Sequence, residues 1–135
     1  MYVRTKPTRC VASSPAMARA WVRASLEDWD GDPAVDHAEL LVSEVATNAL
    51  LHGGTDEPVV DVTHSAELVR VSVRDRTRDR PTRTVKEDPM TPGGYGVVLL
   101  DEISSRWGVA QRVGGKTVWF ELVATAGHRS VTFHD

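Results

Sequence analysis

The sequence predicts an α+β fold: a two-layer sandwich in which helices cover one face of a mixed, mostly antiparallel sheet. Two observations predict it. Stretches with helical periodicity fill the first part of the chain, and four short valine-rich stretches of alternating polarity come after them. Charged residues make up 26% and hydrophobic residues 41% of the 135 positions, as in ordinary globular domains, so we expect residues 1–135 to form one domain.

Two helices are expected before the first strand. The motif SSP is a typical helix start, and apolar residues then recur at helical spacing, which predicts a first helix over 14–29. The motif DGDP separates it from a second helix over about 34–52, which the glycines of HGG end. Tryptophans are expected mainly in the core, with Trp29 the best candidate for an outside contact because it lies at a helix end.

The rest of the chain alternates between strands and a helix. The motifs PVVDVTH and ELVRVSVRD predict an antiparallel strand pair. Residues 76–95 contain prolines and glycines but few apolar residues, so they are expected to form a long exposed loop. The motif GYGVVLLDEISS predicts a third helix, and RWGVAQRV and KTVWFELV predict two further strands around a Gly114-Gly115 turn. For residues 124–135 the sequence makes no prediction.

Composition argues against several classes of protein. No apolar run is long enough to cross a bilayer and the N-terminus lacks the apolar core of a signal peptide, so we expect a cytoplasmic protein without a membrane partner. Cys10 is the only cysteine, which rules out an intrachain disulfide. The formal net charge of −3 argues against direct nucleic-acid binding, although arginines cluster between Arg74 and Arg83. The histidines show no metal-ligating spacing.

A row of polar residues runs along the second predicted helix. Glu44, Asn48 and His52 recur every four positions, beside an apolar face formed by Ala38, Leu41, Val42, Val45 and Ala49. Most such rows are simply solvated. Here Ser43 and Thr47 already supply a polar face, and asparagine is a poor choice in the middle of a helix. A glutamate that accepts a proton beside an amide oxygen that holds a hard cation suits metal-assisted phosphoryl chemistry.

A single aspartate is expected to be buried at the end of a strand. Asp75 has the same parity as Val69, Val71 and Val73, which mark the buried side of their strand. A buried carboxylate needs hydrogen-bond donors. The donor could be a backbone N–H, an arginine of the following loop, or the amine of a ligand.

Glycines precede the third predicted helix. Gly93, Gly94 and Gly96 could present backbone N–H groups to phosphate oxygens at the helix start, but glycines also serve ordinary turns. The Gly-Lys-Ser/Thr of a Walker A loop does not follow them. In the last strand, Lys116 and Thr117 are expected to point to opposite faces of the sheet.

Taken in order, SEVATNALLHG, VRD with RTRDRP, PGGYGVVLLDEISSRWGV and GGKTVWFEL resemble the GHKL ATPase superfamily. Within it, the chain resembles the anti-sigma-factor serine kinases and the short ATP-binding proteins of actinobacteria. The resemblance extends over about residues 14–123. It implies a Bergerat-type fold that holds ATP and Mg²⁺ between the helices and a mobile lid.

The resemblance also implies a role for each residue of the helical row. Asn48 is expected to coordinate Mg²⁺ that bridges the phosphates. Glu44 is expected to orient or deprotonate the attacking hydroxyl as the catalytic residue. His52 is expected to support this wall of the ATP pocket.

The other motifs receive roles in binding the base and closing the lid. The resemblance implies that Asp75 accepts a hydrogen bond from the adenine amino group and that Thr117 lies near the adenine and Asp75. Gly94 and Gly96 are expected to shape the lid against the phosphates. Two features depart from the family pattern: Thr77 stands where a glycine is usual, and the residues directly before Gly94, MTPG, contain no arginine that could reach the terminal phosphate. Arg78, Arg80 or Arg83 is the alternative source of that contact.

These implications lead to two hypotheses. The first is an ATP-dependent serine/threonine protein kinase that binds a sigma factor and phosphorylates an antagonist protein, with a homodimer possible. The second is a non-catalytic nucleotide-binding module whose ATP-ordered lid presents a surface to a protein partner. A complete histidine kinase is not expected, because the sequence has no phosphoacceptor helix ahead of the motifs.

Overall fold

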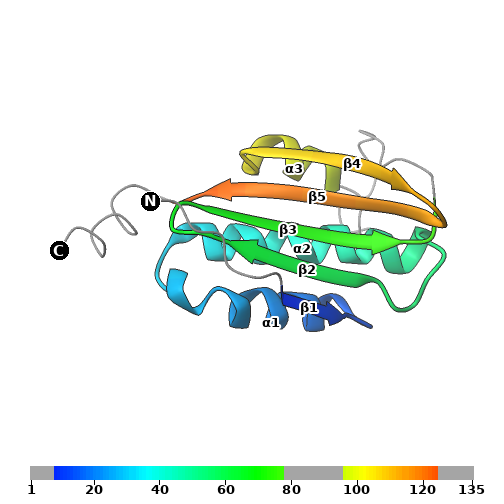
Figure 1. The fold of residues 1–135 in the computed structure, drawn as a ribbon, viewed down its shortest axis with the longest axis horizontal. Helices are drawn as coiled ribbons and strands as arrows, with labels where there is room; N and C mark the ends of the chain where they lie inside the picture. Colours follow the sequence, from blue (N-terminus) through cyan, green and yellow to red (C-terminus); the bar gives the residue numbers. More distant parts are fainter. Residues whose placement is uncertain (1–7, 78–95, 125–135) are drawn as a thin grey trace.

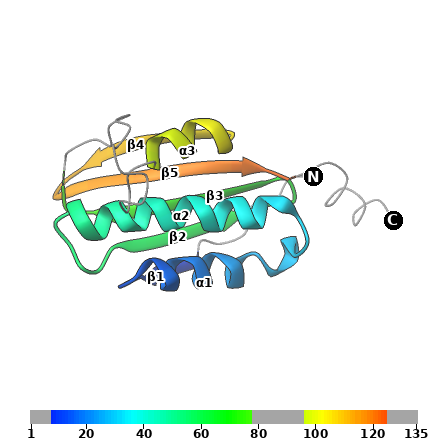
Figure 2. The same cartoon turned by 180° about the vertical axis from the view of Figure 1, so that it is seen from behind.

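The computed structural model describes residues 8–77 and 96–124, which form a sheet with helices packed on one side (Figures 1 and 2). The elements in chain order are β1 (Thr8–Val11), α1 (Pro15–Ser25), the 3₁₀ helix η1 (Glu27–Trp29), α2 (Pro33–His52), β2 (Val59–His64), β3 (Leu68–Asp75), α3 (Gly96–Ile103), β4 (Arg106–Arg112) and β5 (Gly115–Val123). This confirms the predicted α+β two-layer sandwich. The described strands follow the order β1-β2-β3-β5-β4, and each pairing is antiparallel rather than mixed.

The sequence did not predict β1. It pairs with β2 at the edge of the sheet, where Thr8 lies opposite Val62 and Val11 opposite Val59. Its four residues, TRCV, are too few for an alternating pattern to be recognised. An edge strand of this length depends on the hydrogen bonds of its neighbour more than on its own sequence pattern.

The first helix is shorter than predicted. Ser14 caps it by accepting a hydrogen bond from the Met17 N–H at 3.1 Å, but Leu26 leaves the helical conformation with φ −113° and ψ 33°. The following 3₁₀ turn places Trp29 in the core, fully buried, with its indole N–H donating to the Ser65 carbonyl at 3.3 Å. The expectation that Trp29 makes an outside contact is therefore wrong.

The long helix α2 forms the centre of the helical layer. Asp32 caps its first turn by accepting from the Ala34 N–H at 2.9 Å. Its apolar face is buried as predicted, and it packs on apolar side chains of the sheet. The fully buried members of that core on the strands include Val60, Val62, Val69 and Val71. Among the described residues, no helix is long and apolar enough to cross a membrane.

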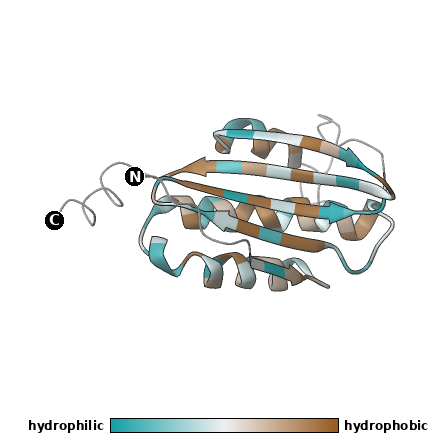
Figure 3. Cartoon of the chain, in the orientation of Figure 1, coloured by the Kyte–Doolittle hydropathy of each residue, from teal (hydrophilic) through white to brown (hydrophobic). Residues whose placement is uncertain are grey.

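The two faces of the sheet differ in chemistry. Along β3, every second residue is buried against the helices, and the residues between them, Arg70, Ser72 and Arg74, face the other way. Hydropathy alternates along the central strands accordingly (Figure 3). Because the helices of residues 8–77 and 96–124 lie on one side only, no described helix covers the opposite face of the sheet; we call it the open face.

Candidate nucleotide-binding site

Asp75 is buried at the end of β3, on the helix-facing side of the sheet, as its parity predicts. Its Oδ1 accepts a hydrogen bond from the Thr77 backbone N–H at 3.0 Å. Its Oδ2 accepts from Lys116 Nζ at 2.7 Å. Lys116 lies directly opposite Asp75 in the β3–β5 ladder. The Lys116 side chain is 7% exposed and the Asp75 side chain is 5% exposed.

Lys116 is the functional candidate that sequence reasoning missed. Of the three donors considered for Asp75, the backbone N–H is present, and among the described residues the charged partner is Lys116. The available signal was parity, because Lys116 alternates in phase with Val118 and Phe120, which are both buried. The sequence pattern does not give the register of β3 and β5, which places Lys116 opposite Asp75.

Thr117 does not lie beside Asp75. In the same register it pairs with Arg74, and directly opposite residues of two strands project to the same face. Thr117 therefore points to the open face and Asp75 to the helix-facing side. Lys116 and Thr117 do project to opposite faces, as predicted, but Lys116 takes the position expected for Thr117.

Two glycines allow close packing around Asp75. A Cβ atom on Gly53 would lie 2.7 Å from the Asp75 Cβ and 2.5 Å from the Ala49 carbonyl oxygen, and one on Gly115 would lie 2.0 Å from the Asp75 carbonyl oxygen. The Arg76 N–H donates to the Gly53 carbonyl at 2.8 Å. These contacts join the C-terminal end of α2, where the helical row ends at His52, to the end of β3, where Asp75 lies.

The helical row lies at the boundary between core and solvent. Glu44 and Asn48 are half-buried, whereas His52, in the last turn of α2, is exposed. Burial raises the pKa of Glu44 above its ordinary value of 4.5, which makes its carboxylate a better proton acceptor. Glu44 and Asn48 thus combine a proton acceptor and an amide oxygen one helical turn apart.

The described residues offer oxygen donors for a metal but no complete metal cage. No group of three or more His, Cys, Asp or Glu side chains within residues 8–77 and 96–124 could hold a metal ion. Mg²⁺ usually keeps several waters and binds one or two protein oxygens together with substrate phosphates. Asn48 is half-buried, and its side-chain amide oxygen is a ligand of the kind that this mode of binding uses.

Of the two lid glycines, Gly96 is the first residue of α3, and Gly94 lies outside the described residues. The predicted loop 76–95 also falls mostly outside them.

A pocket of about 210 Å³ opens beside Asp75. It is lined by Thr55, Glu57, Val59, Arg74, Asp75, Arg76 and Arg112. Neither Glu44 nor Asn48 lines this pocket.

Comparison with known families agrees with this architecture. Residues 11–122 match the histidine kinase-like ATPase domain, and the chain therefore belongs to this family. The predicted resemblance to the GHKL ATPases is confirmed, and the expectation of an ATP-binding domain agrees with that membership.

A solved structure shows the same fold. The crystal structure of the RsbU and RsbW domains of Rv1364c from Mycobacterium tuberculosis matches 90% of this chain with a TM-score of 0.65 and 20% sequence identity. The match covers 33% of that larger chain, so this protein spans about a third of its length. No curated protein matches the sequence significantly.

Proposed function

We propose that this chain is a Mg-ATP-binding regulatory protein that acts as an anti-sigma-factor-like serine/threonine kinase. In this proposal it binds a sigma factor and phosphorylates an antagonist protein. The observation that supports it most is the placement of half-buried Glu44, with its raised pKa, one turn before Asn48 on the same helix. The fold shared with an RsbW domain supports the same class of function.

Each residue has a separate task in the proposed reaction. Asp75 accepts a hydrogen bond from the adenine amino group, and Asn48 holds Mg²⁺, which supplies charge neutralisation when bound. Glu44 orients the substrate hydroxyl and takes its proton as the hydroxyl oxygen bonds to the terminal phosphorus and the bond to ADP breaks. His52 supports the end of the pocket wall, and Gly96 lies where the lid joins α3.

The kinase proposal is tested by phosphoryl transfer from γ-labelled ATP to purified antagonist proteins of the anti-anti-sigma class. Glu44→Gln keeps the size of the side chain but cannot accept the proton, so transfer should be lost while Mg-ATP binding persists. Thr47→Ala on the same helix is a matched control and should keep its activity. Transfer by Glu44→Gln at the wild-type rate would refute the catalytic role.

One observation favours a second candidate, the non-catalytic module. Asp75 is already paired with a buried lysine, so a base that binds there must share or displace that contact. Nucleotide binding is then coupled to rearrangement at the start of β5, as expected of a ligand-controlled docking surface. Slower proteolysis within the predicted loop 76–95 on adding Mg-ATP, without phosphoryl transfer to any antagonist, would favour this module over the kinase.

A further inference from the structure

The open face carries two clusters of the same design, each with one carboxylate between two arginines. In the first, Arg9 Nε lies 2.6 Å and Arg74 Nη2 lies 3.3 Å from the carboxylate oxygens of Asp61. These three residues belong to β1, β3 and β2, so the cluster crosses three neighbouring strands. We call it the Asp61 cluster.

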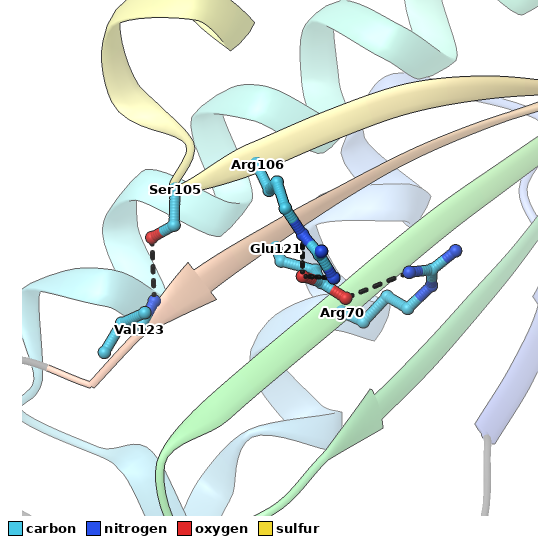
Figure 4. Close-up of polar contacts among 5 residues, drawn as sticks. All are labelled: Arg70, Ser105, Arg106, Glu121 and Val123. Atoms are coloured by element: carbon cyan, nitrogen blue, oxygen red, sulfur yellow. Dashed lines mark hydrogen bonds and ion pairs between the residues drawn. The ribbon is translucent and has the colours of Figure 1, made fainter.

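The second cluster, which we call the Glu121 cluster, lies across β3, β5 and β4. Arg70 Nη1 donates to Glu121 at 2.9 Å, and Arg106 binds its other oxygen through Nε at 2.9 Å and Nη2 at 2.8 Å. Figure 4 shows both guanidinium groups converging on Glu121 from the strands on either side. Each cluster has two positive charges and one negative charge and so keeps one net positive charge.

The positive charges lie outermost in both clusters. The side chains of Asp61 and Glu121 are 12% and 6% exposed, whereas those of Arg9 and Arg106 are 57% and 69% exposed. Burial alone would raise the pKa of Glu121, but hydrogen bonds from Arg106 and Arg70 outweigh it and hold the pKa below its ordinary value. Both carboxylates are therefore covered, and solvent meets the guanidinium groups.

Trp119 holds the arginines of the Glu121 cluster in place. The Arg70 guanidinium lies 4.1 Å and that of Arg106 lies 5.7 Å from the centroid of the Trp119 ring. Gly108 leaves room for this indole, since a Cβ there would lie 2.7 Å from it. The guanidinium groups are thus ordered before any partner arrives, which lowers the entropy lost on binding.

We propose that the open face docks an acidic segment of a partner protein through these two clusters. A guanidinium has five N–H donors in a planar fork that matches a carboxylate, and arginine is enriched in protein interfaces. A second copy of the chain is a poor occupant, because two open faces would bring like charges together. A long polyanion such as DNA is disfavoured because the chain as a whole has a formal charge of −3.

This surface is separate from the candidate nucleotide site. Glu44, Asn48 and Asp75 belong to the helical layer or the helix-facing side of the sheet, and the carboxylates of both clusters lie on the opposite side. Arg74 of the Asp61 cluster also lines the pocket beside Asp75, but the variants tested below leave Arg74 unchanged. Docking on the open face therefore requires no intact nucleotide site. The two proposals can fail independently, because acidic-peptide binding can be measured without nucleotide.

The test measures the fluorescence anisotropy of a labelled peptide of alternating glutamate and glycine, at low and at moderate salt. The double variant Arg9→Gln, Arg106→Gln removes the most exposed arginine of each cluster and leaves one arginine on each carboxylate. It should bind the peptide about fivefold more weakly, as expected for the loss of two exposed charge contacts. Wild-type binding should be saturable and should weaken as salt is added.

The double variant Arg19→Gln, Arg23→Gln on α1 is the matched control, because it removes the same charge from the helical layer. It should bind the peptide like wild type, and both double variants should keep the wild-type circular dichroism spectrum. Equal weakening in both variants, or no saturable binding to wild type, would overturn the proposal. Tighter binding of a mixed-sequence DNA duplex than of the peptide would assign the face to nucleic acid instead. Self-association that only Arg9→Gln, Arg106→Gln abolishes would assign it to a second copy.

Discussion

Lys116 Nζ lies 2.7 Å from Asp75 Oδ2, in a pair whose side chains are both less than a tenth exposed. Two buried charges are costly to remove from water, and a pair of apolar residues would fill the same space without that cost. The pair occupies the position where the family resemblance expects a carboxylate that recognises adenine. We therefore treat Asp75 and Lys116 as one unit, in which the lysine keeps the carboxylate paired in the absence of nucleotide.

The first prediction concerns the energetic coupling of this pair. Lys116→Met should lower the free energy of unfolding by about 3–5 kcal/mol, because it leaves the Asp75 carboxylate buried without its cation. The double variant Asp75→Asn, Lys116→Met should recover a large part of that loss, since the uncompensated charge is gone. Urea denaturation of wild type, Lys116→Met, Asp75→Asn and the double variant measures the coupling. Additive effects of the two substitutions would contradict the pairing.

A second prediction concerns the room that Gly53 provides. Gly53→Ala should destabilise the fold by about 1–3 kcal/mol, because the new methyl group would press on the Ala49 carbonyl and the Asp75 side chain. Its φ is −89°, so the effect comes from crowding and not from backbone conformation. Gly114→Asn is the control: φ is +83° there, a conformation that asparagine tolerates, and no atom lies within 4 Å of the added Cβ. Equal stability of Gly53→Ala and wild type in thermal unfolding would refute the close packing.

Some parts of this corner follow from sequence pattern and others do not. The periodicities of α2 and β3 are local, so the buried face of α2 and the inward direction of Asp75 could be predicted from neighbouring residues. The contact between Asp75 and Lys116 spans 41 positions and depends on the register of two strands. A shift of one residue would have placed Thr117 there, and residue pattern alone does not set that register.

The same limit explains β1 and Trp29. The four residues of β1 are ordered by pairing with β2, and a local pattern does not reveal such a partner. Trp29 was misplaced because continuing the first helix through Leu26 carries it to an exposed end, whereas the 3₁₀ turn sends its ring into the core. The family motifs identified residues by type and order. They did not reveal the two arginine clusters, whose arginines and buried carboxylates come from all five strands of the described sheet.

A third prediction follows from the raised pKa of Glu44. Below the ordinary pKa of 4.5, Glu44 is protonated in the folded and unfolded chain alike, so Glu44→Gln should match wild type in stability. As the pH rises through the folded-state pKa, the half-buried glutamate becomes charged at a cost and wild type loses stability relative to the glutamine variant. Thermal unfolding of both proteins at intervals of about one pH unit between pH 4 and 8 measures this difference in stability. A glutamine variant that is less stable than wild type at neutral pH would contradict it.

A fourth prediction has the opposite sign and concerns the Glu121 cluster. Because the pKa of Glu121 is lowered in the fold, its contribution to stability is present above the ordinary value of 4.5 and is lost as the pH falls through the folded-state pKa. Glu121→Gln should therefore destabilise the protein at neutral pH, and the difference from wild type should shrink in acid. Chemical denaturation at neutral and acidic pH tests this. A difference that does not change with pH would show that the ion pairs do not stabilise the fold.

The most direct test of the nucleotide site is a calorimetric titration with ATP, with and without Mg²⁺, of wild type, Asn48→Ala and Asp75→Asn. Wild type should bind saturably, Asp75→Asn should lose binding because its amide no longer provides the carboxylate that accepts from adenine, and Asn48→Ala should bind ATP without a response to Mg²⁺. Wild type that fails to bind at millimolar nucleotide, or an Asp75→Asn variant that binds like wild type, would contradict the assignment of this corner as a Mg-ATP site.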